Sequence, residues 1–294
     1  MVTNSVCAVI VTYNPDEALI QNIGVTAKQV QQVVIVDNAS QEKGKKLLTE
    51  VKNLHPHTKI IYNSENVGLA TALNQGVKYA IKENYEWVLT LDQDSFPEEN
   101  MVETMLKVYN QVEEKQEIVS LAPRFFNQGV LEKDATNVKT DAPYNFVKRV
   151  ITSGNLVKTE VFKKLGLFED KLFIDFIDHE FCLRLCAYDL KIIQVKDSYL
   201  NHNLGVIRKH NFLGKEIHIV HHSPLRKYYG ARNSVFCYKK YFSQDPKWVL
   251  WNLREGVKSY TKMLIFEEEK WKKLSFVFLG YWHGLKGTMG NLPS

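Results

Sequence analysis

The first half of the chain alternates short runs of β-branched residues with longer amphipathic stretches. The apolar runs predict strands at residues 6–11, 33–36, 58–62, 87–91 and 118–121. Between them, apolar residues recur at helical spacing, and helices are expected from 14–16 onward and at 41–54, 66–82 and 97–114. This alternation predicts an α/β fold in which helices flank a mostly parallel sheet.

The second half has a different pattern. Residues 125–144 are polar and irregular, which predicts a loop or hairpin, and 147–157 should be extended. A helix at 178–189 and a strand at 191–195 follow. From His221 onward the chain is helical in character, with helices expected at 248–263 and 268–285. We therefore expect a domain at 1–240, with halves at 1–122 and 123–240, and a helical extension at 241–294.

Composition narrows the class of protein. Of 294 residues, 45% are hydrophobic and 24% charged, as in ordinary globular domains. The N-terminus lacks the pattern of a signal peptide, and no apolar run is long enough for a membrane span. The four cysteines include only one close pair, Cys182 and Cys186, so we expect buried, reduced thiols and no zinc site.

Charge is distributed unevenly along the chain. From residue 196 onward there are 17 Lys and Arg against 7 Asp and Glu, a net charge of +10, whereas the overall net charge is +5. A basic C-terminal third suggests contact with an anionic surface, such as a lipid leaflet or a phosphate-bearing acceptor. Nucleic acid is not an expected partner, because the sequence carries no zinc finger, RNA-binding aromatic motif or base-reading helix.

Polar residues follow four of the expected strands. In such sheets ligands bind at the carboxyl ends of strands, so these residues are candidates for one site. They are Thr12, Tyr13 and Asn14 after the first strand, Asp37 after the second, Asn63 and Asn66 after the third, and Asp92 and Asp94 after the fourth.

The most informative segment is Asp92-Gln93-Asp94. Two carboxylates at the end of a buried strand offer the hard oxygen ligands that Mg²⁺ or Mn²⁺ prefers. The alternative is that they cap a turn and the helix near Pro97. His202, after the expected strand at 191–195, could be a third metal ligand or a structural histidine.

Two later segments also carry chemistry. Acids at 175, 178 and 180 interrupt an aromatic run, which suits a general base, although Asp178 could simply cap a helix. The segment 221–233 places Arg226 and Arg232 near an expected helix start, where phosphates bind well. Its alternative is a solvated basic helix face.

In order along the chain, these segments resemble the inverting family 2 glycosyltransferases of the GT-A (Rossmann-like) fold. The resemblance covers about residues 5–240. It rests on Val9-Ile10-Val11-Thr12-Tyr13-Asn14, Val34-Ile35-Val36-Asp37-Asn38-Ala39-Ser40, Asn66-Val67-Gly68-Leu69-Ala70, Leu91-Asp92-Gln93-Asp94-Ser95 and the Asp178 segment. Within the family, the chain is most similar to bacterial rhamnosyltransferases of surface polysaccharide synthesis. Segments 92–95, 152–155, 173–184 and 226–233 carry that closer resemblance.

The resemblance implies roles for individual residues. Asp178 would be the catalytic base, although Ile177 replaces a Glu that often precedes that Asp, so Asp175 remains the alternative. Asp92, Asp94 and His202 would hold the metal. Nucleotide-sugar contacts would come from Thr12, Tyr13, Asn14, Asp37, Asn66, Gly68, Asp92, Gln93, Arg226 and Arg232, and acceptor contacts from Gly154, Asn155, Asp175, His179 and Glu180.

The implied reaction moves L-rhamnose from dTDP-β-L-rhamnose to a saccharide or lipid-linked acceptor at the cytoplasmic face of the cell membrane. UDP-glucose, UDP-galactose or UDP-galactofuranose is the alternative donor. A nucleotidyltransferase is less consistent, because Thr12-Tyr13-Asn14-Pro15 is not a Gly-rich basic loop. A non-catalytic carbohydrate-binding protein is the remaining alternative. The aromatic and Lys-rich C-terminal helices suit either a membrane surface or contacts within the protein or a homodimer.

Overall fold

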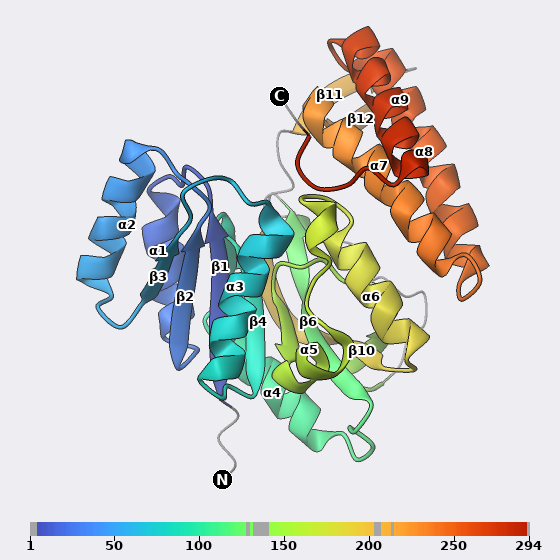
Figure 1. Ribbon diagram of the computed structural model, residues 1–294. Helices are drawn as coiled ribbons and strands as arrows, with labels where there is room; N and C mark the ends of the chain where they lie inside the picture. Colours follow the sequence, from blue (N-terminus) through green and yellow to red (C-terminus); the bar gives the residue numbers. More distant parts are fainter. Residues whose placement is uncertain (1–4, 128–129, 132–140, 203–206, 213–214, 293–294) are drawn as a thin grey trace. The chain divides into compact units, whose positions relative to one another are not determined.

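The computed structural model describes residues 5–127, 130–131, 141–202, 207–212 and 215–292. The chain forms two compact units, whose elements are labelled in Figure 1. The first contains Met1–Asp170 and Ile177–Asn203, and the second contains Lys171–Phe176 and Leu204–Ser294. Within the described ranges, no helix is long and apolar enough to cross a membrane.

The first unit is built on a sheet that has ten strands in the described part of the chain. Their order is β3-β2-β1-β4-β9-β6-β10-β5, with β7 paired to β6 and β8 to β10. The strands are β1 (Val6–Thr12), β2 (Gln32–Asp37), β3 (Lys59–Tyr62), β4 (Trp87–Asp92), β5 (Ser95–Pro97), β6 (Ile118–Asn127), β7 (Val130–Leu131), β8 (Tyr144–Val147), β9 (Asn155–Lys158) and β10 (Lys191–His202).

Strands β1 to β4 are parallel, as the sequence predicted. Their register aligns the strand ends, with Thr12 beside Asp37 and Val11 beside Asp92. Strand β9 is antiparallel to both β4 and β6, so the sheet as a whole is mixed. The α/β class is confirmed, and the parallel part provides the sheet edge on which the candidate site depends.

Helices flank this sheet, and all except the one at 159–165 were predicted from the sequence. They are α1 (Ala18–Ala27), α2 (Glu42–Leu54), α3 (Leu69–Lys82), α4 (Met101–Gln111), α5 (Thr159–Leu165) and α6 (Ile177–Ala187), with a 3-10 turn, η1 (Asp170–Leu172), before α6. Helix α3 lies very close to β1, because a Cβ built on Gly76 would come within 2.2 Å of Val9 Cγ1. The buried residues of β1, β2, β4, α1, α2 and α4 form one hydrophobic core.

The boundaries differ from the sequence prediction where strands pair at a distance. The helix expected at 97–114 begins only at Met101, because the residues before it form β5 on β10. The strand expected at 191–195 continues to His202. In the segment expected to be a loop or hairpin, β7 pairs with the end of β6, and residues 128–129 and 132–140 lie outside the described residues.

The second unit contains a hairpin and three helices. They are β11 (Ile207–Phe212), β12 (Lys215–Val220), α7 (Pro224–Tyr241), α8 (Pro246–Phe266) and α9 (Lys270–Lys286). Ser223 and Asp245 accept hydrogen bonds from backbone N–H groups in the first turns of α7 and α8. The expected domain boundary at 240 stays a prediction. The compact units themselves divide after Asn203, and α7 packs against α9 within the second unit.

Candidate active site

The order of the parallel strands puts a topological switch point between β1 and β4. From β1 the chain builds outward through β2 and β3, then returns to the other side of β1 as β4. Ligands bind at such a switch point, outside the carboxyl ends of the strands. Here Tyr13 N–H donates to Gln93 Oε1 over 2.8 Å, and Asn22 Nδ2 donates to the carbonyls of Asp92 and Gln93. The loops that follow β1 and β4 are therefore joined at this point.

Asp37, at the end of β2, holds its own loop. Its carboxylate accepts hydrogen bonds from Thr12 Oγ1 at 3.1 Å, from Ser40 Oγ at 2.5 Å and from Ser40 N–H at 3.1 Å. Thr12 and Asp37 are both fully buried. Ala39, between Asp37 and Ser40, has a φ of 66°. The Asp37 carboxylate therefore fixes a strained turn at the edge of the sheet.

Asparagine side chains connect the neighbouring loops. Asn14, with a φ of 49°, accepts from Gln41 N–H at 2.8 Å, so the β1 and β2 loops are held together. Asn38 Nδ2 donates to Asn66 Oδ1 at 2.9 Å, which joins the β2 and β3 loops. Asn66 also accepts from Gly68 N–H, where a φ of 85° suits glycine. Tyr13, Asn14 and Asn66 are exposed at this edge.

The two acids after β4 differ in environment. Asp92 is half-buried, whereas Asp94 is exposed, and no hydrogen bond to its carboxylate comes from the described residues. Strand β10 pairs with β5 so that the backbone of His202 lies opposite Ser95, next to Asp94. The structure thus brings the chain at His202 to the end of β4, although its side chain lies outside the described part.

Asp92 and Asp94 could supply part of the ligand set of a divalent cation. Among the described side chains, no group of three or more His, Cys, Asp and Glu is arranged to hold a metal ion. Asp92 and Asp94 offer carboxylate oxygens at one strand end, and Mg²⁺ sites commonly have one or two carboxylates, with substrate phosphates completing them. The donor set therefore suits a hard cation that binds together with a phosphorylated ligand.

The segment 152–155 lies against the end of β4. Ser153 Oγ accepts from Asp92 N–H at 2.9 Å and donates to Ser95 Oγ at 2.8 Å. Gly154 has a φ of 80° and donates to the Thr90 carbonyl, and Asn155 Oδ1 accepts from Ser120 Oγ at 2.6 Å. Gly154 and Asn155 are both buried. Their observed contacts support the Asp92 loop and leave little surface for an acceptor.

Asp178 lies in the first turn of α6, which begins at the same edge of the sheet (Figure 1). Nearby, Asp170 Oδ1 accepts from Thr71 Oγ1 in the first turn of α3, directly after the β3 loop. The Asp178 carboxylate is half-buried and accepts from the N–H of His179 at 2.8 Å. Asp178 and His179 are therefore both partly accessible at the start of α6.

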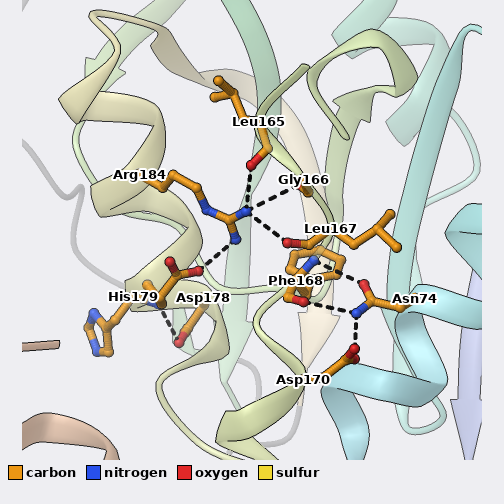
Figure 2. A network of polar contacts seen from close by, with 10 residues as sticks. Asn74, Leu165, Gly166, Leu167, Phe168, Asp170, Asp178, His179 and Arg184 are labelled. Atoms are coloured by element: carbon orange, nitrogen blue, oxygen red, sulfur yellow. Dashed lines mark hydrogen bonds and ion pairs between the residues drawn. The ribbon is translucent and has the colours of Figure 1, made fainter. Parts of the chain in front are cut away.

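Arg184 fixes the loop that precedes this helix (Figure 2). Its Nη1 donates to the carbonyls of Leu165, Gly166 and Leu167 at 3.1, 3.1 and 2.8 Å. Its Nη2 pairs with Glu180 Oε2 at 2.7 Å, and Glu180 is completely buried. Asn74 of α3 completes the network by bonding Phe168 and Asp170. Glu180 is thus enclosed in a structural ion pair, which is a poor position for the acceptor contact we expected.

The segment just before α6 belongs to the second unit and is strained. Phe173, Asp175 and Phe176 have φ values of 64°, 65° and 66°. Asn233 Nδ2 of α7 donates to the carbonyls of Leu172, Ile174 and Asp175 at 2.8–2.9 Å. Three left-handed residues within four positions are costly, so these bonds have a clear role in holding the segment.

Two arginines of α7 contact the same segment. Arg226 Nε pairs with Asp175 Oδ1 at 3.1 Å and is half exposed. Arg232 is fully buried, donates to the Gly290 and Leu172 carbonyls, and lies over the rings of Tyr228 and Tyr229. Arg232 is thus enclosed by structural contacts, whereas Arg226 keeps an accessible guanidinium.

Sequence reasoning missed the residues that support the site, namely Asn22, Asn74, Arg184 and Asn233. Asn22 and Asn74 are polar side chains on otherwise apolar helix faces, which is a detectable signal. Arg184 lies four residues after Glu180, a spacing that allows an ion pair on a helix. Asn233 lies in the segment 226–233, but its partners could not be predicted because they lie about sixty residues away.

The cysteines have no visible part in this chemistry. None of the four forms a disulfide, and Cys7, Cys182 and Cys237 are buried while Cys186 is half-buried. Burial raises the pKa of Cys7 to about 12 and also raises the pKa of Cys182. These two thiols therefore remain protonated and unreactive at neutral pH.

The chain is similar in sequence to known glycosyltransferases. The dTDP-rhamnosyl transferase RfbF of Shigella flexneri is 27% identical over 98% of this chain and 97% of its own length. An uncharacterized glycosyltransferase of Rickettsia typhi, RT0329, is also 27% identical, over 64% of this chain and 57% of its own length.

Solved structures share the fold at low identity. The S. aureus TarS 1–349 structure matches with a TM-score of 0.52 and 14% identity, over 96% of this chain and 72% of that one. GalNAc-T7 with UDP, GalNAc and Mn²⁺ matches with a TM-score of 0.56 and 15% identity, over 92% and 57%. The family profile described as Glycosyl transferase family 2 matches residues 7–169, more than half of the chain. The chain therefore belongs to glycosyltransferase family 2.

Proposed function

We propose that this glycosyltransferase moves L-rhamnose from dTDP-β-L-rhamnose to a saccharide hydroxyl on a lipid-linked acceptor, with inversion at the anomeric carbon. The observation that supports this best is the similarity to a dTDP-rhamnosyl transferase along nearly the whole of both chains. The proposed place of the reaction is the cytoplasmic face of the cell membrane, in surface polysaccharide synthesis.

The nucleotide is proposed to bind at the carboxyl edge of β1 to β4. Tyr13, Asn14, Asn66 and Gln93 provide accessible side chains or loop backbone there. Because Thr12 and Asp37 are buried and bonded to each other, we assign them to shaping the nucleotide loops. Gly68 precedes α3, whose N-terminal N–H groups suit an anionic ligand.

Asp92 and Asp94, with His202, are proposed to hold Mg²⁺ or Mn²⁺. Such an ion would offset the negative charge of the leaving diphosphate. The GalNAc-T7 structure of the same fold contains UDP and Mn²⁺, which supports divalent metal use without identifying the ion. Arg226 is the proposed additional cation for the diphosphate. Arg232 is not, because it is fully buried.

Asp178 is proposed as the general base. It removes the proton of the acceptor hydroxyl while that oxygen attacks the anomeric carbon and the nucleoside diphosphate leaves. A single displacement converts the β-linked donor into an α-linked product. Asp175 is the weaker candidate, because Arg226 already pairs with its carboxylate. His179 remains a proposed acceptor contact beside Asp178.

Mutation of the two acids tests these roles. Asp178→Asn should lower turnover about 10²- to 10⁴-fold while calorimetry shows nearly unchanged donor affinity. Asp175→Asn is the matched control and should retain much more activity. Full activity of Asp178→Asn would reject the assignment. Asp94→Ala should abolish metal-dependent donor binding, and unchanged affinity would count against the metal site.

A donor panel tests the substrate. Purified protein is incubated with dTDP-rhamnose, UDP-glucose, UDP-galactose or UDP-galactofuranose, and release of the nucleoside diphosphate is measured without acceptor. Slow hydrolysis of dTDP-rhamnose alone is the expected result. Turnover of a UDP-sugar in its place would replace the donor, and no hydrolysis of any donor with metal present would favour a carbohydrate-binding role.

A further inference from the structure

Helix α9 packs against α7 through small residues. A Cβ built on Gly280 would lie 2.4 Å from the Tyr228 carbonyl oxygen, and one on Gly284 would lie 2.7 Å from that of Arg232. The buried positions of α9 are Lys273, Val277, Gly280 and Gly284, at spacings of four, three and four residues. One face of α9 is therefore fully used inside the second unit.

The opposite face of α9 is apolar and exposed. Trp271 is 80% exposed, Phe278 65%, Trp282 57% and Leu285 62%, at spacings of seven, four and three residues. A soluble helix would normally carry polar residues on this face. The folded unit therefore leaves large aromatic groups directed away from its own packing.

Helix α8 repeats this arrangement. Trp248, Val249 and Met263 are buried, whereas Leu250, Leu253, Val257 and Leu264 are exposed at spacings of three, four and seven residues. Among the described residues, eleven of the eighteen exposed large hydrophobic side chains lie on α8 and α9. So large an apolar surface indicates a binding function.

The charge of the same two helices indicates what kind of partner would bind this apolar surface. Together α8 and α9 contain eight Lys and Arg but a single acid, Glu255. Several of the cations are exposed beside the apolar residues, including Arg254, Lys258 and Lys272. Lys286 Nζ lies 4.6 Å from the ring centre of Trp282. Contact with a second copy across this face would bring cations against cations, whereas an anionic surface complements them.

We propose that the exposed faces of α8 and α9, called here the α8–α9 face, bind the surface of an anionic lipid bilayer. Trp, Phe and Leu enter the boundary between headgroups and acyl chains, and Lys and Arg contact the lipid phosphates. Because neither helix is long and apolar enough to span a bilayer, they lie on its surface. This binding needs no sugar donor and is independent of the transfer reaction.

Flotation of the full-length protein with vesicles tests the proposal. Wild type should float with vesicles of phosphatidylcholine and phosphatidylglycerol and stay in solution with phosphatidylcholine alone. The apolar variant Trp271→Ser/Phe278→Ser/Trp282→Ser should bind at least about tenfold more weakly. The charge variant Lys272→Gln/Lys286→Gln should lose about fivefold per lysine. The control Leu54→Ser/Tyr62→Ser, which removes two exposed apolar side chains from the first unit, should bind like wild type.

The outcome separates lipid from protein partners. All substituted side chains on α9 are exposed, so each variant should keep the circular dichroism spectrum of wild type. Failure of wild type to float with anionic vesicles would overturn the proposal. Equal binding by wild type and the apolar variant would overturn it too. If instead analytical ultracentrifugation showed a dimer that the apolar variant abolishes, with no vesicle binding, the α8–α9 face would be a contact between copies.

Discussion

Replacement of Arg184 should destabilise the first unit more than any ordinary surface substitution. In Arg184→Met the completely buried Glu180 carboxylate loses the guanidinium that lies 2.7 Å away, and three carbonyls of residues 165–167 lose their donor. Removing one partner of a buried ion pair costs about 3 to 5 kcal/mol. The expected loss in unfolding free energy is therefore about 3 to 5 kcal/mol.

The double variant Glu180→Met/Arg184→Met separates the ion pair from packing. Apolar residues of similar volume can replace a buried pair at little cost, so the double variant should recover at least about 2 kcal/mol of that loss. Arg254→Met is the control, since Arg254 is exposed on α8, and should change stability by less than about 0.5 kcal/mol.

The assay is urea unfolding followed by far-UV circular dichroism. Hydrogen exchange of peptides from α6 reports the first unit alone, because α6 lies entirely within that unit. A loss below about 1 kcal/mol in Arg184→Met would refute the reasoning from the buried pair. A double variant as unstable as the single one would show that the three carbonyl hydrogen bonds dominate instead.

Three further predictions follow from single contacts. Gly280→Ala should lower the stability of the second unit by about 1 to 3 kcal/mol, because its new methyl group overlaps the Tyr228 carbonyl; thermal unfolding of Gly256→Ala, at an open site, should show no loss. Asn233→Ala should lower kcat about tenfold or more with little change in donor affinity, because it frees the strained segment that leads into α6; unchanged kcat would contradict this. Burial lowers the pKa of His222 from 6.5 to about 4, helped by nearby Arg226 and Lys227, so the stability it contributes is present above pH 6.5 and is lost as the pH falls toward 4; melting temperatures of His222→Gln should fall less steeply than wild type across that window.

Much of the first unit was predictable from local pattern. The β-branched runs at β1, β2 and β4 are almost entirely buried, as is typical of parallel strands covered on both faces, whereas β3 is only partly buried. The polar residues after these strands could be grouped because parallel strands end at one edge. The apolar spacing within residues 66–82 likewise identified the buried side of α3, whereas α8 and α9 also expose apolar residues that periodicity alone could not assign.

The pairing of strands that lie far apart in the sequence could not be predicted from local residue patterns. No feature of residues 155–158 indicates that β9 inserts antiparallel between β4 and β6, which converts a parallel sheet into a mixed one. The same insertion places Ser153 against Asp92. The position of His202 opposite Ser95 depends on the pairing of β10 with the short β5. These contacts depend on which strands pair in the folded sheet and in which register, and the spacing of residues along the chain does not determine either.

The sequence by itself determined which residues are candidates for catalysis and binding, because ionisable and polar side chains that follow predicted strands can be identified from the sequence. Only the tertiary structure decided which of them remain accessible. Burial enclosed Asp37, Glu180 and Arg232 in hydrogen bonds and ion pairs, while Asp94, Asp178 and Arg226 kept exposed or partly exposed groups. The physical reason is desolvation: a charged group withdrawn from water must find its partner inside the protein, and that partner is fixed by folding rather than by sequence proximity.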